Sequence, residues 1–203
     1  FIGKRRLEAA IAQVDLGTAP VVVRYRPWLL RPKMALDKGK CVGKRSSYIK
    51  MFKGDVGRFN AMVKRITQIG LEDDVNIAFR YEGDIGTTID CSQLIMWAES
   101  YGLQYQHELK DQFMRAYHEQ AKNIALKEVM LDCVKLVNGL KDHVDEAETV
   151  LNTNAFQKAV ADQILEARKK LGVNGVPHFF ITAVNGDARR SFNFPGAQDT
   201  RFF

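Results

Sequence analysis

Two strand-like segments lie towards opposite ends of this sequence, and the residues between them follow a helical pattern. The run Val21-Val22-Val23-Arg24-Tyr25-Arg26 is rich in β-branched residues and is followed by proline, which predicts a strand that ends there. The run His178-Phe179-Phe180-Ile181-Thr182-Ala183-Val184 predicts a second strand, and Asn185-Gly186 is a hairpin signal before a return strand over Ser191-Phe192-Asn193-Phe194. Because the first run is apolar without alternation, we expect a sheet that helices cover on both faces. The sequence therefore predicts an α/β fold.

The block between the strands, from about residue 43 to residue 152, predicts helices that each bury one face. Apolar residues recur there at three- and four-residue steps, which is the period of a helix and not of a strand. Two more helices are predicted over residues 2–14 and 154–171 by the same spacing. The stripes of the block are Val56, Phe59, Met62, Val63, Ile66 and Ile69; Ile89, Leu94, Ile95, Trp97, Ala98 and Tyr101; Leu109, Phe113 and Tyr117; Leu126, Val129, Met130, Cys133, Val134 and Val137; and Ala147, Val150 and Leu151.

Charge is distributed unevenly along the chain. Residues 1–70 hold 16 Lys and Arg against 4 Asp and Glu, whereas residues 71–203 hold 14 against 20. A basic half attracts anions, but its cations do not alternate with aromatic residues and no nucleic-acid-binding signature is present. We therefore expect a solvated basic face and no nucleic-acid partner. The sequence has no run of 18 apolar residues, so we expect no membrane span.

The cysteines and histidines do not form a recognisable reactive group. Cys41, Cys91 and Cys133 are far apart in the sequence, with no Cys-x-x-Cys pair and no zinc-ligand spacing. An odd and sparse set of cysteines favours a reducing compartment, so we expect a cytoplasmic protein without a bound metal. Cys133 lies on an apolar stripe and is predicted to be an inert core thiol. His107 and His118 fall on polar helix faces and are predicted to be solvated.

Several stretches resemble DsbA-like thioredoxin-fold oxidoreductases of the FrnE type. The most specific is Leu171-Gly172-Val173-Asn174-Gly175-Val176-Pro177-His178-Phe179-Phe180-Ile181, which resembles the L-G-V-x-G-V-P-x-F-x-I block of that family. The start of the chain, Phe1-Ile2-Gly3-Lys4-Arg5-Arg6-Leu7-Glu8, resembles the segment that directly follows a CPWC-type site. The other similar stretches are residues 24–32, Gly86-Thr87-Thr88-Ile89-Asp90 with Leu94-Ile95, and Phe194-Pro195-Gly196-Ala197-Gln198.

The resemblance implies a thioredoxin-like fold interrupted by an all-helical insertion domain. Residues 1–43 and 154–203 would form the thioredoxin-like domain, and residues 44–153 the insertion. Compared with the family, the first strand and the last helix are expected to be missing from the sequence. The family is related to 2-hydroxychromene-2-carboxylate isomerases and kappa-class glutathione transferases.

The resemblance also implies where the site lies. It places a Cys-x-x-Cys pair just before Phe1, so no catalytic residue is assigned within the chain. In the family the bond corresponding to Val176–Pro177 is cis and faces the active site, where the backbone of Val176 binds substrate and Trp28 lines the cleft. Val176, Ala197 and Gln198 would bind glutathione, the last two at the start of a helix. The family's Asn and His in the helical motif are replaced here by Thr87 and Ser92.

The function expected from the resemblance is thiol–disulfide exchange. The alternatives are a glutathione-dependent isomerase or transferase and a redox-inactive thioredoxin-fold protein that binds peptides. We expect no bound cofactor, with glutathione as a co-substrate. The expected partners are thiol or disulfide substrates, either proteins or glutathione, and a second copy of the chain in a homodimer.

Overall fold

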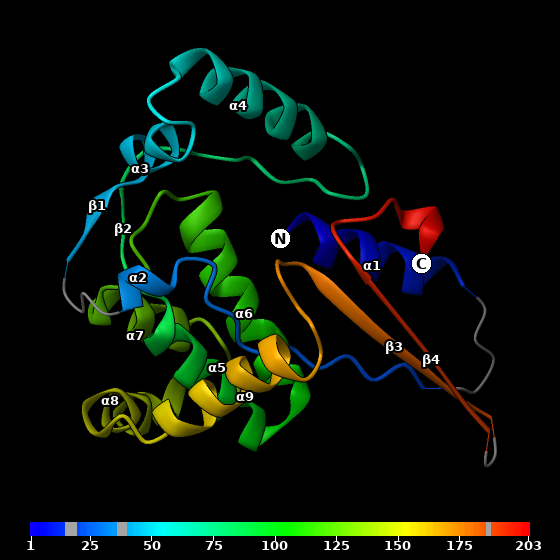
Figure 1. Ribbon diagram of the computed structural model, residues 1–203. Helices are drawn as coiled ribbons and strands as arrows, with labels where there is room; N and C mark the ends of the chain where they lie inside the picture. The colour runs from blue at the N-terminus through cyan, green and yellow to red at the C-terminus, as the bar shows by residue number, and fades with distance from the viewer. Residues whose placement is uncertain (15–19, 36–39, 186–187) are drawn as a thin grey trace.

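The computed structural model describes residues 1–14, 20–35, 40–185 and 188–203, and Figure 1 shows a helical body with a long hairpin beside it. The strands are β1 (Val42–Gly43), β2 (Asp84–Ile85), β3 (His178–Asn185) and β4 (Ala188–Pro195). The helices are α1 (Ile2–Gln13), α2 (Pro32–Ala35), α3 (Lys44–Met51), α4 (Val56–Gly70), α5 (Ile89–Tyr101), α6 (Leu103–His118), α7 (Lys127–Lys135), α8 (Val144–Thr153) and α9 (Gln157–Lys169). Two 3-10 turns, η1 (Lys141–His143) and η2 (Thr200–Phe202), complete the described chain.

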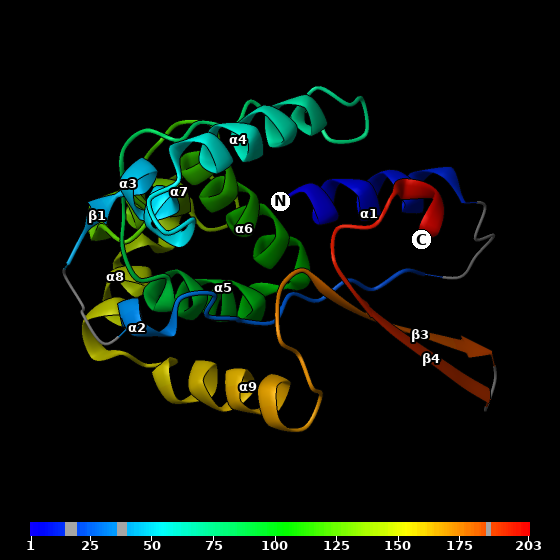
Figure 2. The same ribbon diagram turned by 45° about the horizontal axis from the view of Figure 1, so that its top comes forward.

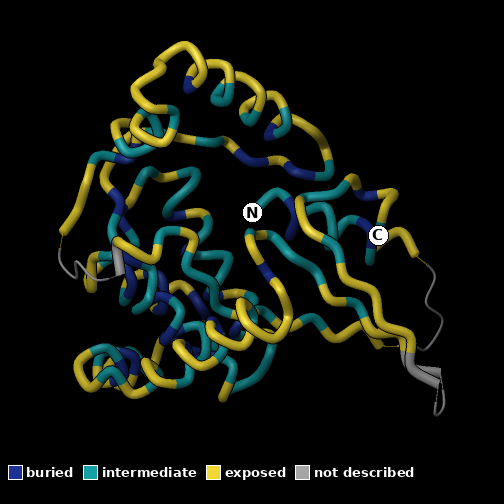
Figure 3. Tube along the Cα trace, viewed as in Figure 1, coloured by how far each residue is buried: buried dark blue, intermediate teal, exposed yellow. Residues whose placement is uncertain are grey.

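The main hydrophobic core lies in the helical body. Its buried side chains come from α5, α6, α7 and α8 and from the turns between them, and Figure 3 shows buried residues gathered there. The stripes predicted from the sequence supply most of this core, because a helix with one apolar face is stable only when that face is packed against another element. The largest fully buried core side chains are Leu94, Leu109, Met130, Val134, Val137 and Leu140.

The hairpin predicted near the end of the chain is confirmed. Strands β3 and β4 pair antiparallel with Phe179 opposite Phe194 and Ile181 opposite Phe192, so these four residues share one face. That face packs on the end of the chain: the ring of Phe179 lies 4.8 Å from Phe203, and the ring of Phe194 lies 4.8 Å from Phe202. Figures 1 and 2 show α1 and η2 side by side next to the hairpin. Gly186, the second residue of the hairpin signal, lies outside the described residues.

The strand predicted over residues 21–26 is wrong. In the described part of the chain this segment is extended but belongs to no sheet, and Val21 and Val22 are 47% and 70% exposed. Its backbone is bound by side chains of α6 instead: Tyr25 N–H donates to Gln106 Oε1 at 2.9 Å, and Gln106 Nε2 donates to the Tyr25 carbonyl at 3.3 Å. A ring nitrogen of His107 also lies 2.7 Å from the Val23 carbonyl oxygen. Side chains of α6 therefore bind the N–H and carbonyl of Tyr25 and the carbonyl of Val23, groups that could otherwise join a strand ladder.

The predicted domain boundaries lie next to helix ends. Residue 44 begins α3 directly after the short strand β1. Residue 154 ends α8 in the left-handed conformation (φ 52°), which asparagine tolerates, and α9 begins three residues later. The division into residues 1–43 with 154–203, and 44–153, stays a prediction. None of the helices in the described ranges is both long and apolar enough to cross a lipid bilayer.

Candidate functional site

The first turn of α1 packs directly on the Val176–Pro177 segment. The Val176–Pro177 peptide bond is cis. A Cβ atom at Gly3 would lie 2.9 Å from Cγ of Pro177, 3.1 Å from Cζ of Phe179 and 3.5 Å from Cα of Ala197. Only a glycine fits at this position without displacing its neighbours. The start of α1, the proline segment and the residues after β4 are therefore brought to one place.

Val176 presents free backbone at this place. The residue is 47% exposed, and its N–H and carbonyl bond to no other described residue. The next carbonyl, that of Pro177, is already bound by the N–H of Gly196 at 2.8 Å. Val176 is thus the point where the β3–β4 ladder stops and where an extended chain has backbone groups to bind.

A buried lysine of α1 and a partly buried lysine of α6 lie near the start of α1. Lys4 is 6% exposed and pairs with Glu8 and with Asp111 of α6, to which it donates at 2.9 Å. The ammonium of Lys110 lies 4.7 Å from the centre of the Tyr25 ring, and burial, together with the charge of Lys4, lowers its pKa to about 8. Lys4 and Lys110 therefore both lie between α1 and α6. The ammonium of Lys110 contacts an aromatic ring and has no hydrogen-bond acceptor among the described residues.

A second buried lysine lies at the far end of α6. Lys44 is 2% exposed and donates to the carbonyls of Arg80 and Tyr117 at 2.6 and 2.7 Å. Its ammonium also lies 4.0 Å from the centre of the Tyr117 ring. Burial lowers the pKa of Lys44 to about 8 because the charged form is poorly solvated there.

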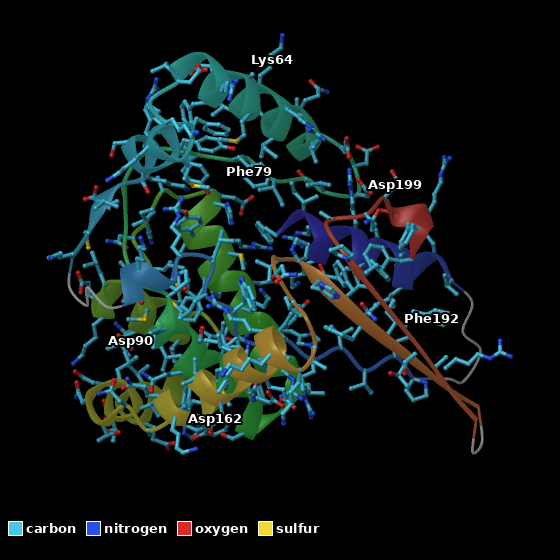
Figure 4. The ribbon with its side chains drawn as sticks, viewed as in Figure 1. Lys64, Phe79, Asp90, Asp162, Phe192 and Asp199 are labelled. Carbon is cyan, nitrogen blue, oxygen red and sulfur yellow. The ribbon has the colours of Figure 1, made fainter. Side chains whose placement is uncertain are left out.

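His118 is only partly exposed and its ring is enclosed by aromatic side chains, which corrects the prediction that it is solvated. Its ring stacks on Phe1 at 5.7 Å between centres and meets the edges of Phe79 and Tyr117 at 5.4 and 4.7 Å. Figure 4 labels Phe79 on the loop that follows α4, above the end of α6. Burial first, and the positive charges of Lys44 and Lys110 after it, lower the pKa of His118 to about 3. The imidazole beside α1 is therefore neutral near pH 7.

Ala197 and Gln198 lie next to α1, but most of their polar groups are hydrogen-bonded within the chain. Arg6 Nη1 donates to the carbonyl of Ala197 at 3.1 Å, and Gln198 N–H donates to the Gly196 carbonyl at 3.0 Å. The helix start expected at Ala197 and Gln198 is not formed there, and the short turn η2 begins at Thr200. Its first N–H groups face a carboxylate of the chain itself, since Asp199 accepts from Arg201 N–H at 3.1 Å (Figure 4). The described residues therefore provide no free helix N-terminus for the glutathione contact predicted at Ala197 and Gln198.

Trp28 and the substituted motif residues have other contacts. The guanidinium of Arg168 on α9 lies 4.8 Å from the centre of the Trp28 ring and donates to the Leu29 carbonyl at 3.1 Å. At the start of α5, Thr87 Oγ1 accepts from Ile89 N–H at 3.4 Å, and Ser92 Oγ donates to the Thr88 carbonyl at 3.0 Å. Thr87 and Ser92 therefore hold local backbone, and the place of Trp28 in a substrate cleft stays a prediction.

The cysteines of the chain are poor nucleophiles or lack a redox partner. Cys91 and Cys133 are both 4% exposed, and burial raises the pKa of Cys91 well above its usual range and that of Cys133 to about 11. Cys41 is exposed and accepts a hydrogen bond from Asn123 Nδ2 at 3.0 Å. All three are free thiols. The described residues contain no cluster of His, Cys, Asp and Glu that would hold a metal ion.

Sequence reasoning missed Gly3, Lys110 and His118. Lys110 and His118 are eight residues apart on α6 and share one helical face, which is a signal that the sequence contains. The sequence makes that face look like a polar surface, because no neighbouring residue in the chain indicates that α1 covers it. The role of Gly3 is equally invisible, since it depends on a proline that is 174 positions away in the chain.

One comparison with known proteins identifies a family. The sequence model described as the DSBA-like thioredoxin domain matches residues 1–203, which is the full length of the chain. No curated protein matches the sequence. The family resemblance and the thioredoxin-like fold class expected from the sequence are thereby confirmed, at the level of the DsbA-like family.

Proposed function

Because this chain belongs to the DSBA-like thioredoxin domain family, we propose that it supports thiol–disulfide exchange at the start of α1. In this proposal the protein is an FrnE-type disulfide oxidoreductase, and its Cys-x-x-Cys pair directly precedes Phe1. One observation carries the proposal: the first turn of α1 packs through Gly3 on the Val176–Pro177 segment, beside exposed backbone. Reactive thiol and substrate chain would meet there.

The surroundings of α1 favour a thiolate. The free N–H groups and the dipole at a helix start stabilise a negative charge, and α1 has no acidic residue in its first turn. The ammonium of Lys110 is held nearby without a carboxylate of its own, so it can stabilise an anion at the same place. His118 is neutral and adds no charge near pH 7.

The proposed reaction is disulfide exchange. The thiolate attacks one sulfur of a substrate disulfide, which forms a mixed disulfide and releases the other substrate sulfur as a thiolate that takes up a proton. The second thiol of the pair then displaces the first substrate sulfur. The pair is oxidised to a disulfide, and the substrate is reduced by two electrons to two thiols; the same steps in reverse oxidise a dithiol substrate.

The substrate would be held as an extended chain at Val176. Its backbone would bond to the N–H and carbonyl of Val176, a half-exposed residue whose backbone groups bond to no other described residue. Glutathione would serve as a co-substrate and not as a bound cofactor. Cys91 and Cys133 do not serve as the pair, since both are buried with raised pKa values.

The experiment is an insulin-reduction assay on the natural protein with dithiothreitol as electron donor. The proposal predicts accelerated reduction that is lost when the upstream cysteines are replaced by serine and kept in Cys41→Ser, Cys91→Ser and Cys133→Ser. A protein that instead conjugates glutathione to an electrophile would be a transferase-type relative. Activity that depends on Cys41, or no exchange activity with upstream cysteines present, would overturn the proposal.

A further inference from the structure

A cavity lies between α5 and α8, on the side of the helical body away from the β3–β4 hairpin. Helices α5 and α8 pack against each other, and Figures 1 and 2 both show α8 far from the hairpin. The volume of the cavity is about 360 Å³, which is enough for a small molecule. Its lining residues are Trp97 of α5 and Asp145, Glu146, Thr149 and Val150 of α8.

The charged groups that line this cavity are carboxylates, and no Lys or Arg is among the lining residues. Asp145 and Glu146 belong to the first turn of α8 and are exposed. The carboxylate of Asp145 makes no hydrogen bond or ion pair with any described residue. The hydroxyl of Thr149 donates to the backbone carbonyl of Asp145 at 2.8 Å, so its proton is already used. The cavity therefore offers negative charge and hydrogen-bond acceptors.

Two side chains of the helical body hold the carboxylate of Glu146 in position. The hydroxyl of Tyr101 donates to its Oε2, and Nδ1 of His143 lies 2.9 Å from its Oε1. The rings of Tyr101 and His143 also pack together, 4.8 Å apart between centres. Hydrogen bonds, from Tyr101 first and from His143 after it, lower the pKa of Glu146 below its ordinary value. Glu146 is therefore an oriented and ionised carboxylate near pH 7.

The tryptophan distinguishes this cavity from an ordinary acidic helix start. Acidic residues in a first turn stabilise the helix dipole, and Glu128 does so in α7. Trp97, however, is 4% exposed, and its indole N–H donates to no described residue, whereas a buried indole N–H usually has an acceptor. This N–H is not sealed inside the protein, because the enclosed polar atoms without a partner belong to other residues of the described chain. Since Trp97 lines the cavity, a ligand there can accept its hydrogen bond.

We propose that this cavity binds a guanidinium or ammonium group carried on a short alkyl chain. The cation would bind the carboxylates of Asp145 and Glu146, since charge-assisted hydrogen bonds to a carboxylate are strong. The methylene groups would pack on Trp97 and Val150, which is 7% exposed. A hydrogen-bond acceptor at the other end of the alkyl chain would bind the indole N–H.

A free alkyl cation and the side chain of an arginine or lysine in a peptide both carry this group. Only the peptide also has a backbone carbonyl beside the alkyl chain, and that carbonyl would accept from the N–H of Trp97. The unbonded indole N–H therefore favours the side chain of a peptide. The cavity shares no residue with the start of α1 or with the Val176–Pro177 segment, so this inference does not depend on the proposed function.

The test is a titration of isotope-labelled protein, followed through the tryptophan indole N–H signals in two-dimensional NMR spectra. The chain has two tryptophans, so Trp28→Phe assigns the signal of Trp97. We expect Nα-acetyl-arginine N-methylamide to shift this signal with a Kd on the order of 1 mM. The matching citrulline compound, in which a neutral urea replaces the guanidinium, should bind at least tenfold more weakly. Weaker binding of n-propylguanidinium, which lacks the carbonyl, would assign the cavity to peptides, and binding at least as tight would assign it to free alkyl cations.

Variants locate the site. Asp145→Asn and Glu146→Gln should each weaken binding of the arginine compound at least threefold, and the double variant at least tenfold; both residues are exposed, so the fold should be unaffected. Glu128→Gln removes the same charge from the first turn of α7, at an exposed position outside the cavity, and should leave the Kd unchanged. No shift of the Trp97 signal, equal binding of the arginine and citrulline compounds, or a Kd that the double variant leaves unchanged would overturn the proposal. None of these results bears on insulin reduction, which tests the proposed function separately.

Discussion

Replacing Gly3 by alanine tests whether α1 packs on the proline segment. The added Cβ would lie 2.9 Å from Cγ of Pro177, 3.1 Å from Cζ of Phe179 and 3.5 Å from Cα of Ala197. Ring and backbone atoms close the space on these sides, so the strain cannot be relieved by turning one flexible side chain. Overpacking of this kind costs about 1–3 kcal/mol.

The helix propensity of alanine partly offsets this loss of stability. Alanine is favoured over glycine inside a helix by up to about 1 kcal/mol, so the net loss of stability should be about 1 kcal/mol. For a chain of this size that lowers Tm by about 2–4 °C. Differential scanning calorimetry at pH 7 measures this change directly.

A matched control exists in α4. Gly57 is the second residue of α4, as Gly3 is of α1, and its added Cβ would meet only Oδ1 of Asp55, at 3.2 Å. Asp55 is exposed, and its Oδ1, which accepts from the N–H of Arg58, has to shift only slightly to admit the Cβ, so Gly57→Ala should leave Tm close to that of the wild type. If Gly3→Ala behaved like Gly57→Ala, the close packing of α1 on Pro177 would be refuted.

Three further substitutions test the charges around α1. His118 has a folded-state pKa of about 3, below its ordinary value, so the unfolded chain binds more protons below about pH 6.5 and the protein loses stability as the pH is lowered. His118→Phe should reduce this loss of stability between pH 7 and pH 4, measured by urea unfolding. An unchanged loss would contradict the desolvation of the ring. Lys44 has a folded-state pKa of about 8, again below its ordinary value, so the wild type should gain stability relative to Lys44→Met as the pH rises from 8 to 10. A difference in stability between the two proteins that stays constant over this range would count against a buried ammonium. In the natural protein, Lys110→Met should raise the pKa of the thiol before α1 and so slow its reaction with iodoacetamide at pH 6 several-fold. Lys64→Met, which removes an exposed charge on α4, should not slow this reaction. Equal rates in both variants would exclude Lys110 from the site.

The sequence was sufficient wherever structure depends on neighbours in the chain. The apolar stripes predict the helices of the body, because the apolar residues of each stripe are spaced three and four residues apart. The hairpin was predicted for the same reason: two β-rich runs flank a turn signal, and β3 and β4 pair with each other. These features need no knowledge of distant residues.

Features that depend on distant residues were missed or wrong. The segment at residues 21–26 has strand composition, but strand formation requires a partner, and Gln106 and His107 of α6 bind its backbone instead. Lys4 is buried, and Lys110 is partly buried, because α1 and α6 face each other, whereas the sequence alone makes a lysine look like a surface residue. For the site, Val176 and Pro177 came from the family resemblance, whereas the groups that surround them came from the structure.

Peptide mapping of the alkylated natural protein tests the central proposal most directly. The protein is denatured and labelled with iodoacetamide before and after reduction, and the labelled peptides are sequenced. We expect two cysteines in a Cys-x-x-Cys arrangement immediately before Phe1 that become labelled only after reduction of the oxidised protein, while Cys41, Cys91 and Cys133 are labelled in both samples. A natural protein in which no cysteine pair precedes α1 would contradict thiol–disulfide exchange at this site.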